Sequence, residues 1–196
     1  MTMQMPSALA KNYYIDTAHT MSVKVAEPPN EQINRNPGDI SISCGNVAAN
    51  YTLYIDANHK RTAKFTSGFT TFTPEGSVTE GILAIDQTFY INKAFDLRAT
   101  FALGQIAYFN PDGHAFAGYL AADQSFYIND AHTLKAVLAQ NGKVVLSNNG
   151  RALDGVLAKD TTLYANRAHT KTAKYQAGTR VQFNGDGSVI SAELPQ

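Results

Sequence analysis

The sequence lacks tryptophan altogether and contains one cysteine, Cys44, among its 196 residues. A lone cysteine excludes an intrachain disulfide and a cysteine-rich zinc site, so we expect Cys44 to be a buried thiol without a chemical role. The chain also has no glycine-rich phosphate loop, no Gly-x-Ser-x-Gly and no His-Glu-x-x-His sequence. These absences remove the usual sequence support for nucleotide binding, serine hydrolysis and zinc-dependent hydrolysis.

An excess of charge of either sign is also missing. Lysine plus arginine and aspartate plus glutamate number 16 each, so no net field attracts nucleic acid or an anionic membrane. The local basic stretches at Lys60-Arg61 and 171–174 are interpreted as solvated strand edges. No apolar run approaches the ~20 residues of a membrane span, and Met1–Lys11 lacks the pattern of a signal peptide. We expect a soluble protein without a nucleic-acid partner or a membrane span, either cytoplasmic or exported by another route.

The main positive feature is a Tyr-x-Asp/Asn motif that occurs five times, at spacings of 40, 36, 37 and 37 residues. The fifth residue after each tyrosine is histidine in four copies and phenylalanine in one. A fixed period of this length predicts one supersecondary unit copied along the chain and stacked on its neighbours. The tyrosines are Tyr14, Tyr54, Tyr90, Tyr127 and Tyr164, and the residues five positions later are His19, His59, Phe95, His132 and His169.

These motifs divide the chain into an N-terminal extension, 1–11, and one repeat domain, 12–196. The predicted units are 12–50, 51–86, 87–123, 124–160 and 161–196. The first unit is degenerate and carries an extra stretch around Glu27-Pro28-Pro29-Asn30. In the last unit, alternating apolar and polar residues with glycine-rich turns predict strands over 162–165, 172–175, 179–183 and 188–194.

The expected fold is therefore all-β, built from five tandem four-stranded antiparallel repeats. Strands with apolar residues on both faces suit blades that pack on both sides, so we favour a compact β-propeller. A β-solenoid or spiral β-meander, in which the units stack along a line, is the alternative. No Trp-Asp pair or kelch double glycine is present to identify a known repeat family.

The candidate ligand-binding residues are the repeated aromatic and imidazole side chains. A tyrosine ring can stack on a sugar or peptide through its flat face, but identical packing between units also explains an identical residue in every copy. We favour the packing role, and expect truncation of Tyr127 to cost the ~3–5 kcal/mol of a buried aromatic. The candidates are Tyr14, Tyr54, Tyr90, Tyr127, Tyr164, His19, His59, His132 and His169.

The positions around each tyrosine separate turn structure from metal binding. Two residues after the tyrosine, either aspartate or asparagine is accepted, which an Asx-turn tolerates and a metal site would not. The histidines lie in the turn that follows. Either a structural hydrogen bond, a ligand contact once per unit or a shared metal site explains them, and we favour the first. We expect no metal and no cofactor.

Repetition supplies like groups at many places, whereas catalysis needs unlike groups at one place. A unique site would have to come from residues that break the pattern, such as Cys44, Phe95-Asp96 or His114. The sequence therefore favours a non-enzymatic multivalent binding module, possibly lectin-like, with a glycan or protein ligand and one candidate site per repeat. The alternative is a structural or protein-interaction scaffold or appendage component, and an enzyme is the less favoured class. The oligomeric state is left open.

Overall fold

The computed structural model describes residues 9–27 and 33–194, and this part of the chain forms twenty β-strands and no helix. The prediction of an all-β protein with antiparallel sheets is confirmed. Since no helix occurs in these ranges, none could cross a membrane. The predicted insertion at Pro28-Pro29-Asn30 lies outside the described residues.

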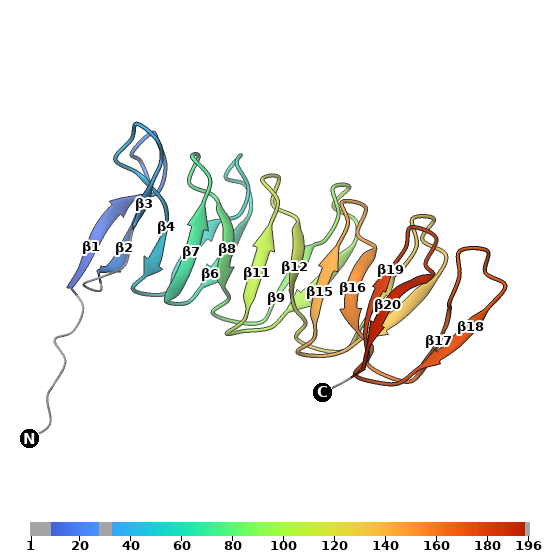
Figure 1. Ribbon diagram of the computed structural model, residues 1–196. Coiled ribbons are helices and arrows are strands. Elements are labelled where there is room, and N and C mark those ends of the chain that lie inside the picture. The colour runs from blue at the N-terminus through green and yellow to red at the C-terminus, as the bar shows by residue number, and fades with distance from the viewer. Residues whose placement is uncertain (1–8, 28–32, 195–196) are drawn as a thin grey trace, which may run out of the picture.

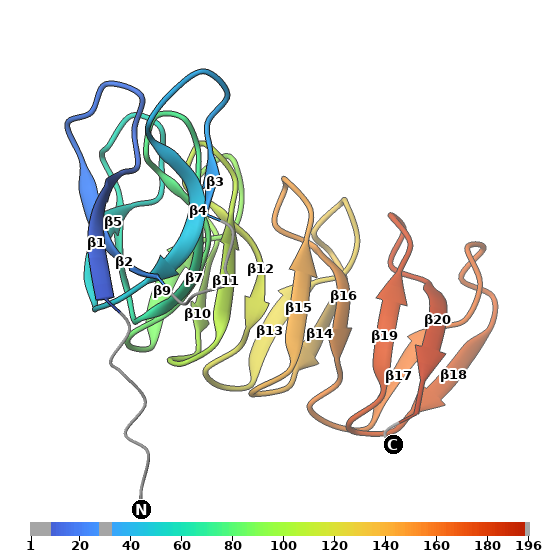
Figure 2. The ribbon, with the colours of Figure 1, turned by 60° about the vertical axis from the view of Figure 1, so that its left-hand side comes forward.

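The strands form two layers (Figures 1 and 2). A twelve-stranded sheet runs from one end of the molecule to the other, and ten of its strands make the inner layer. The pairs formed by these ten strands are here called inner hairpins. They are β3–β4 (Asn34–Arg35 and Ile42–Val47), β7–β8 (Gly68–Phe72 and Val78–Ile82), β11–β12 (Ile106–Phe109 and Ala115–Tyr119), β15–β16 (Lys143–Leu146 and Ala152–Val156) and β19–β20 (Arg180–Phe183 and Val189–Glu193).

The second layer consists of hairpins that do not pair with one another through their main chains, here called outer hairpins. Each carries one Tyr-x-Asp/Asn turn. They are β1–β2 (Leu9–Tyr14 and Ser22–Glu27), β5–β6 (Tyr51–Tyr54 and Thr62–Phe65), β9–β10 (Gln87–Tyr90 and Arg98–Phe101), β13–β14 (Gln124–Tyr127 and Lys135–Leu138) and β17–β18 (Thr161–Tyr164 and Thr172–Tyr175). The first of them is joined to the long sheet by the single pair Val25↔Val47.

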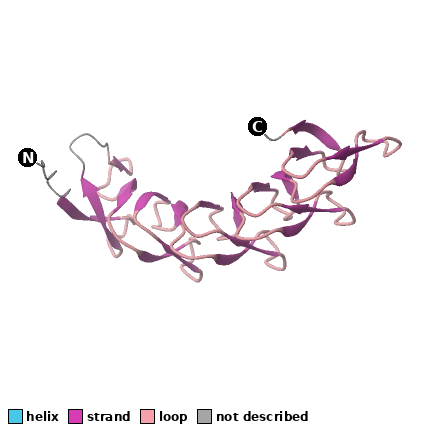
Figure 3. Cartoon of the chain, turned by 90° about the horizontal axis from the view of Figure 1, so that it is seen from below, coloured by secondary structure: helices cyan, strands magenta, loops and turns pink. Residues whose placement is uncertain are grey.

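The molecule is an open arc rather than a ring (Figure 3). The compact propeller favoured from the sequence is wrong, because the long sheet runs from β1 to β20 without closing. In a propeller, four strands stay together as one blade. Here the three middle inner hairpins instead pair along both edges with their neighbours, as β8 does with β11 and β12 with β15. This edge pairing spreads the strands into one long sheet on the concave side of the arc.

Glycines in the inner strands let the two layers approach closely. A Cβ atom added to Gly118 would lie 2.6 Å from the Phe101 ring, and one added to Gly81 would lie 2.7 Å from the Phe65 ring. Both phenylalanines are fully buried and lie at the end of an outer hairpin. The hydrophobic core is thus a continuous seam between the layers, filled by apolar side chains from the outer hairpins, such as Phe65, Phe89 and Phe101.

Side chains replace the missing main-chain pairing between outer hairpins. The Gln87 amide accepts a hydrogen bond from Lys64 N–H (2.9 Å) and donates one to the Lys64 carbonyl (2.9 Å). Gln124 does the same to Thr100, at 2.8 and 2.7 Å. At the N-terminal end, the Tyr51 hydroxyl accepts from Lys24 N–H at 2.7 Å. A bridging amide side chain spans a wider gap than direct main-chain pairing between two strands. The outer hairpins therefore stay apart, and grooves open between them.

Candidate functional site: the turns and grooves of the outer hairpins

Each outer turn is closed by the side chain of its Asp or Asn residue. The carboxylate of Asp16 accepts hydrogen bonds from Thr20 N–H (3.0 Å) and Met21 N–H (2.7 Å). The amide oxygen of Asn129 makes the same pair of contacts, with Thr133 and Leu134 N–H at 3.0 and 2.9 Å. Only an acceptor oxygen is needed, which is why the position tolerates both residue types.

The pKa of Asp16 is lowered by the hydrogen bonds that close the first turn. Burial raises the pKa of Asp16, but hydrogen bonds from Met21 N–H and from the Thr20 hydroxyl and N–H outweigh it, so the net pKa lies below the ordinary value. A lowered pKa means that this turn is most stable above the pKa of the unfolded chain and loses stability as the pH falls through the folded value.

The histidine of each turn has a left-handed backbone, with φ between 54° and 56° at His19, His59, His132, His169 and, in the third turn, Phe95. Four imidazoles lie against the tyrosine of their own motif. The ring centroids are 4.6 Å apart for Tyr127 and His132 and 4.1 Å apart for Tyr164 and His169. Tyr54–His59 and Tyr14–His19 are similar, at 4.6 and 5.0 Å. Phe95 meets Tyr90 edge to face. The fifth residue after each motif tyrosine therefore contributes a ring that packs against that tyrosine.

The imidazoles also contact the loops of inner hairpins. His19 Nε2 lies 2.8 Å from Asp39 Oδ1, and His59 Nε2 lies 2.8 Å from the Glu75 carbonyl. The hydrogen bond from His19, followed by one from Ser41 N–H, lowers the pKa of Asp39 to about 2. His132 differs, because its Nε2 atom is buried without a hydrogen-bond partner among the described residues. Among the described residues, no three His, Cys, Asp or Glu side chains gather as a metal site.

Three cavities open at corresponding places between successive outer hairpins, with volumes of 440, 250 and 180 Å³. Each lies between two outer hairpins, reaches the glycine of an inner loop and is lined by a motif tyrosine. We call them the outer grooves. The tyrosines are Tyr54 with Gly76, Tyr90 with Gly113 and Tyr127 with Gly150. Tyr14 and Tyr164 line none of these three grooves.

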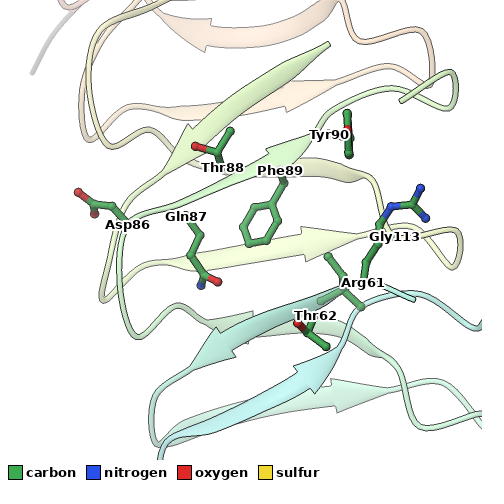
Figure 4. Close-up of a pocket in the computed structure, with 9 residues that line it drawn as sticks. Arg61, Thr62, Asp86, Gln87, Thr88, Phe89, Tyr90 and Gly113 are labelled. Atoms are coloured by element: carbon green, nitrogen blue, oxygen red, sulfur yellow. The ribbon is translucent and has the colours of Figure 1, made fainter. Parts of the chain in front are cut away.

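The largest outer groove joins β5–β6 to β9–β10 (Figure 4). Its apolar wall is formed by Ile55, Phe89 and Tyr90. The Arg61 guanidinium carbon lies 3.8 Å from the centroid of the Phe95 ring and 5.9 Å from that of Tyr90. Thus Phe95, which replaces histidine in this turn, supports a cation at the groove edge.

A cation also flanks the aromatic ring in the neighbouring groove. The Arg98 guanidinium carbon lies 4.4 Å from the Tyr90 ring centroid, and Lys135 Nζ lies 4.4 Å from that of Tyr127. Lys135 and Tyr127 line the 180 Å³ groove together. In the 250 Å³ groove, the corresponding hairpin contributes Met21 and Ser22, which carry no charge. The grooves therefore share their tyrosine but differ in charge.

A separate hollow of 550 Å³ lies at the ends of the turns, where Tyr127 and His132 face residues 92–97 and Asn148-Asn149. One predicted tyrosine, Tyr127, and one predicted histidine, His132, line this cavity together. Lys93 and Asp96 add opposite charges to its wall.

The residues that break the sequence pattern do not assemble a reactive site. His114 is 2% exposed, and its Nδ1 and Nε2 atoms are paired with Asp112 Oδ1 (2.5 Å) and Asn110 Nδ2 (2.7 Å) in its own loop. Cys44 is a free, buried cysteine in β4. Asp96 is hydrogen-bonded to Asn92 within the third turn. His114 and Asp96 therefore make hydrogen bonds within their own loops, and Cys44 is buried.

Sequence reasoning missed two groups of residues. Gln87 and Gln124, which bridge the outer hairpins, each directly follow an aspartate at a unit boundary, a spacing that could have drawn attention to them. The second group lies on the concave face, where Tyr108 lies 6.0 Å from Phe116 and 5.2 Å from Lys143 Nζ. Burial, followed by the nearby Glu80 and Tyr119, raises the pKa of Tyr108.

Comparison of the chain with protein-family models, with curated proteins and with solved structures finds no match.

Proposed function

We propose that the protein is an open β-solenoid of five tandem units and acts as a non-enzymatic, multivalent binding module. The observation that carries the proposal is the recurrence of the outer groove at three corresponding places, each time with a motif tyrosine in its wall. A structural tyrosine alone would not require a groove beside it. Solenoids present such repeated sites along one extended surface.

The groove chemistry suits a neutral or weakly anionic ligand with flat apolar faces and hydroxyl groups, such as a glycan. The half-buried tyrosine rings supply a stacking surface, and Thr62, Thr88 and Ser125 supply hydroxyls. The largest groove falls within the ~300–1,000 Å³ of small-molecule sites, and the other two are smaller. Single sites of this kind bind weakly, and a polymer that occupies several of them gains avidity.

A glycan array followed by titration calorimetry tests this function. Wild-type protein is compared with the variant Tyr54→Ala plus Tyr90→Ala plus Tyr127→Ala, and with Tyr108→Ala, a half-buried tyrosine of the concave face, as the matched control. We expect the triple variant to lose more than tenfold in apparent affinity for a polymeric ligand while the control keeps it. Equal binding by all three proteins removes the outer grooves from the proposal.

A protein-interaction scaffold is the second candidate, and the concave face favours it. Half-exposed apolar residues continue across neighbouring strands there, as in the pair Ile82↔Ile106. Contiguous exposed apolar surface is typical of protein interfaces. If Tyr119→Lys plus Phe116→Ser abolishes binding of a protein partner while the outer-groove variant retains it, the scaffold function replaces the glycan-binding one.

A further inference from the structure

The contacts inside the molecule show what each outer hairpin requires from its neighbours. The turn of each of the first four outer hairpins donates a main-chain hydrogen bond to the loop of the second inner hairpin that follows it in the chain, so that β1–β2 donates to the β7–β8 loop. The four bonds are Thr17 N–H to the Pro74 carbonyl (2.9 Å), Ala57 to Pro111 (2.9 Å), Lys93 to Asn148 (2.9 Å) and Asp130 to Gly185 (2.8 Å). Each of these outer hairpins is therefore covered by the second inner hairpin after it in the chain.

The last outer hairpin, β17–β18, lacks this cover, because no inner hairpin follows β19–β20 within the described residues. Tyr175 is half-exposed, whereas Phe65, Phe101 and Leu138 at the corresponding position are fully buried. Asn166 is likewise half-exposed, whereas its four counterparts are buried. Beside it, β20 is an edge strand of the long sheet, with Ile190 60% exposed.

The opposite end of the molecule has the complementary feature, an inner hairpin whose loop covers no outer hairpin among the described residues. Among the described residues, the first inner hairpin, β3–β4, covers no outer hairpin in this way, because β1–β2 is covered by β7–β8, and β3 is paired only with β4. Its loop carries Pro37 at the position of Pro74 and Pro111, with the loop closed by Asn36 N–H donating to the Ser41 carbonyl (3.0 Å). One end thus offers an uncovered outer hairpin and a free strand edge, and the other offers a free inner hairpin.

Two residues that depart from the repeat complement each other across these ends. Inside the array, Phe109 lies 4.9 Å from Phe89 and 6.2 Å from Phe65, the two outer hairpins it bridges. Arg35 occupies the position of Phe109 in β3, and its guanidinium carbon already lies 6.0 Å from the Tyr13 ring, the counterpart of Phe89. The counterpart of Phe65 is Tyr175. An arginine facing a second tyrosine is a favourable cation–π pair.

We propose that the protein associates head to tail with a second copy of itself, so that β3–β4 of one copy covers β17–β18 of the next and β3 extends the sheet at β20. This surface continues a contact that the chain already makes four times internally, and it is independent of any ligand in the outer grooves. Extrapolated from the internal register, Asn34 lies opposite Ser191 of the other copy. Because each copy is an arc (Figure 3), successive copies form a closed ring or an open helical filament.

Disulfide trapping tests the predicted register. Because the native Cys44 faces Asn34 across β3–β4, both trapping variants carry Cys44→Ser. Asn34→Cys plus Ser191→Cys then places cysteines at both ends of one chain, too far apart to join within it, and directly facing across the proposed contact. Under mild oxidation we expect a ladder of dimers, trimers and larger species that collapses on reduction. The control, Asn34→Cys plus Leu103→Cys, moves the second cysteine to an exposed loop residue and should give no ladder. Equal cross-linking of the two variants overturns the register.

Sedimentation velocity over a concentration series tests the association itself. Ile190→Lys puts a charge on the proposed contact, and Leu103→Lys puts the same charge at a residue of matched exposure, 60% against 61%. Wild type and Leu103→Lys should sediment faster as concentration rises, and Ile190→Lys should stay monomeric with an unchanged circular dichroism spectrum. Arg35→Glu should weaken association from the other end. A wild-type monomer at every concentration would mean that Arg35 and the short β3 strand act as caps against edge pairing, and would refute the proposal.

Discussion

The two layers of the molecule differ in how one hairpin is joined to the next. In the inner layer, neighbouring hairpins pair directly through main-chain hydrogen bonds, as β12 does with β15. In the outer layer, side chains such as Gln87 and Gln124 bridge a gap that the main chain does not close. The outer path along an arc is longer than the inner one, so its hairpins separate. The concave layer is therefore a continuous sheet, and the grooves lie in the convex layer.

Loss of a side chain from the seam between the layers should have the largest effect. Phe101→Ala removes a fully buried ring that packs against Gly118, and should lower the free energy of unfolding by about 3–5 kcal/mol. Urea denaturation measures it. Phe69→Ala, at a ring 47% exposed on the inner sheet, is the control and should cost far less. Similar losses for both would mean that the seam does not hold the layers together.

Tyr127→Ala should have an intermediate effect. The sequence alone predicts the cost of a buried aromatic, but the structure shows a half-buried ring that lines two cavities and stacks on His132. We therefore expect a loss of about 2 kcal/mol, within the ordinary range for single substitutions. Urea denaturation beside Phe101→Ala provides the comparison. A loss as large as that of Phe101→Ala would place Tyr127 in the core and weaken the case for a ligand contact.

Removal of one bridge between outer hairpins should have a smaller effect. Gln124→Ala deletes the two hydrogen bonds to Thr100 and should cost about 1 kcal/mol, since the bridge is partly solvated. Amide exchange at Thr100 should accelerate while exchange in the inner strand β12 does not change. Gln124→Glu keeps the acceptor but loses the donor, and should fall between wild type and alanine. The exposed Gln105→Ala is the control, and faster exchange in both layers would contradict their separation.

The smallest predicted effect is a pH dependence at the first turn. The folded pKa of Asp39, about 2, lies below its ordinary value of 3.8, mainly because His19 donates a hydrogen bond to the carboxylate. The stability that this pair contributes is present above pH ~4 and is lost as the pH falls through the folded pKa. The difference in denaturation midpoint between wild type and Asp39→Asn should therefore shrink from pH 5 to pH 2. A constant difference would show that the contact is not charge-dependent.

Local structure was predictable from the sequence to a large extent. The strand expected over 172–175 is β18, and the Asp/Asn position forms the turn that its tolerance of both residues indicated. The histidine turns were predicted as turns, but their left-handed φ and the stacking on tyrosine were not. Phe95 was the informative residue, because a ring that replaces imidazole suggests packing rather than ligation.

The arrangement of the units could not be predicted in the same way. Closure into a ring or extension into an arc depends on the small rotation between neighbours summed over the whole array, and no single residue encodes it. Two sets of residues contribute to this rotation. Glycines at positions 45, 81, 118 and 155, at intervals of 36 or 37 residues, let the layers meet, and the glutamines hold the outer hairpins apart. Both depend on contacts between strands that are distant in the sequence.

Small-angle X-ray scattering, extrapolated to zero concentration so that association does not contribute, tests the open arc most directly. A compact fold of 196 residues, such as a closed propeller, would have a radius of gyration of ~16 Å. The open two-layered arc predicts a clearly larger radius and a skewed distance distribution with a long tail. A radius near the compact value, with a symmetrical distance distribution, would contradict the account.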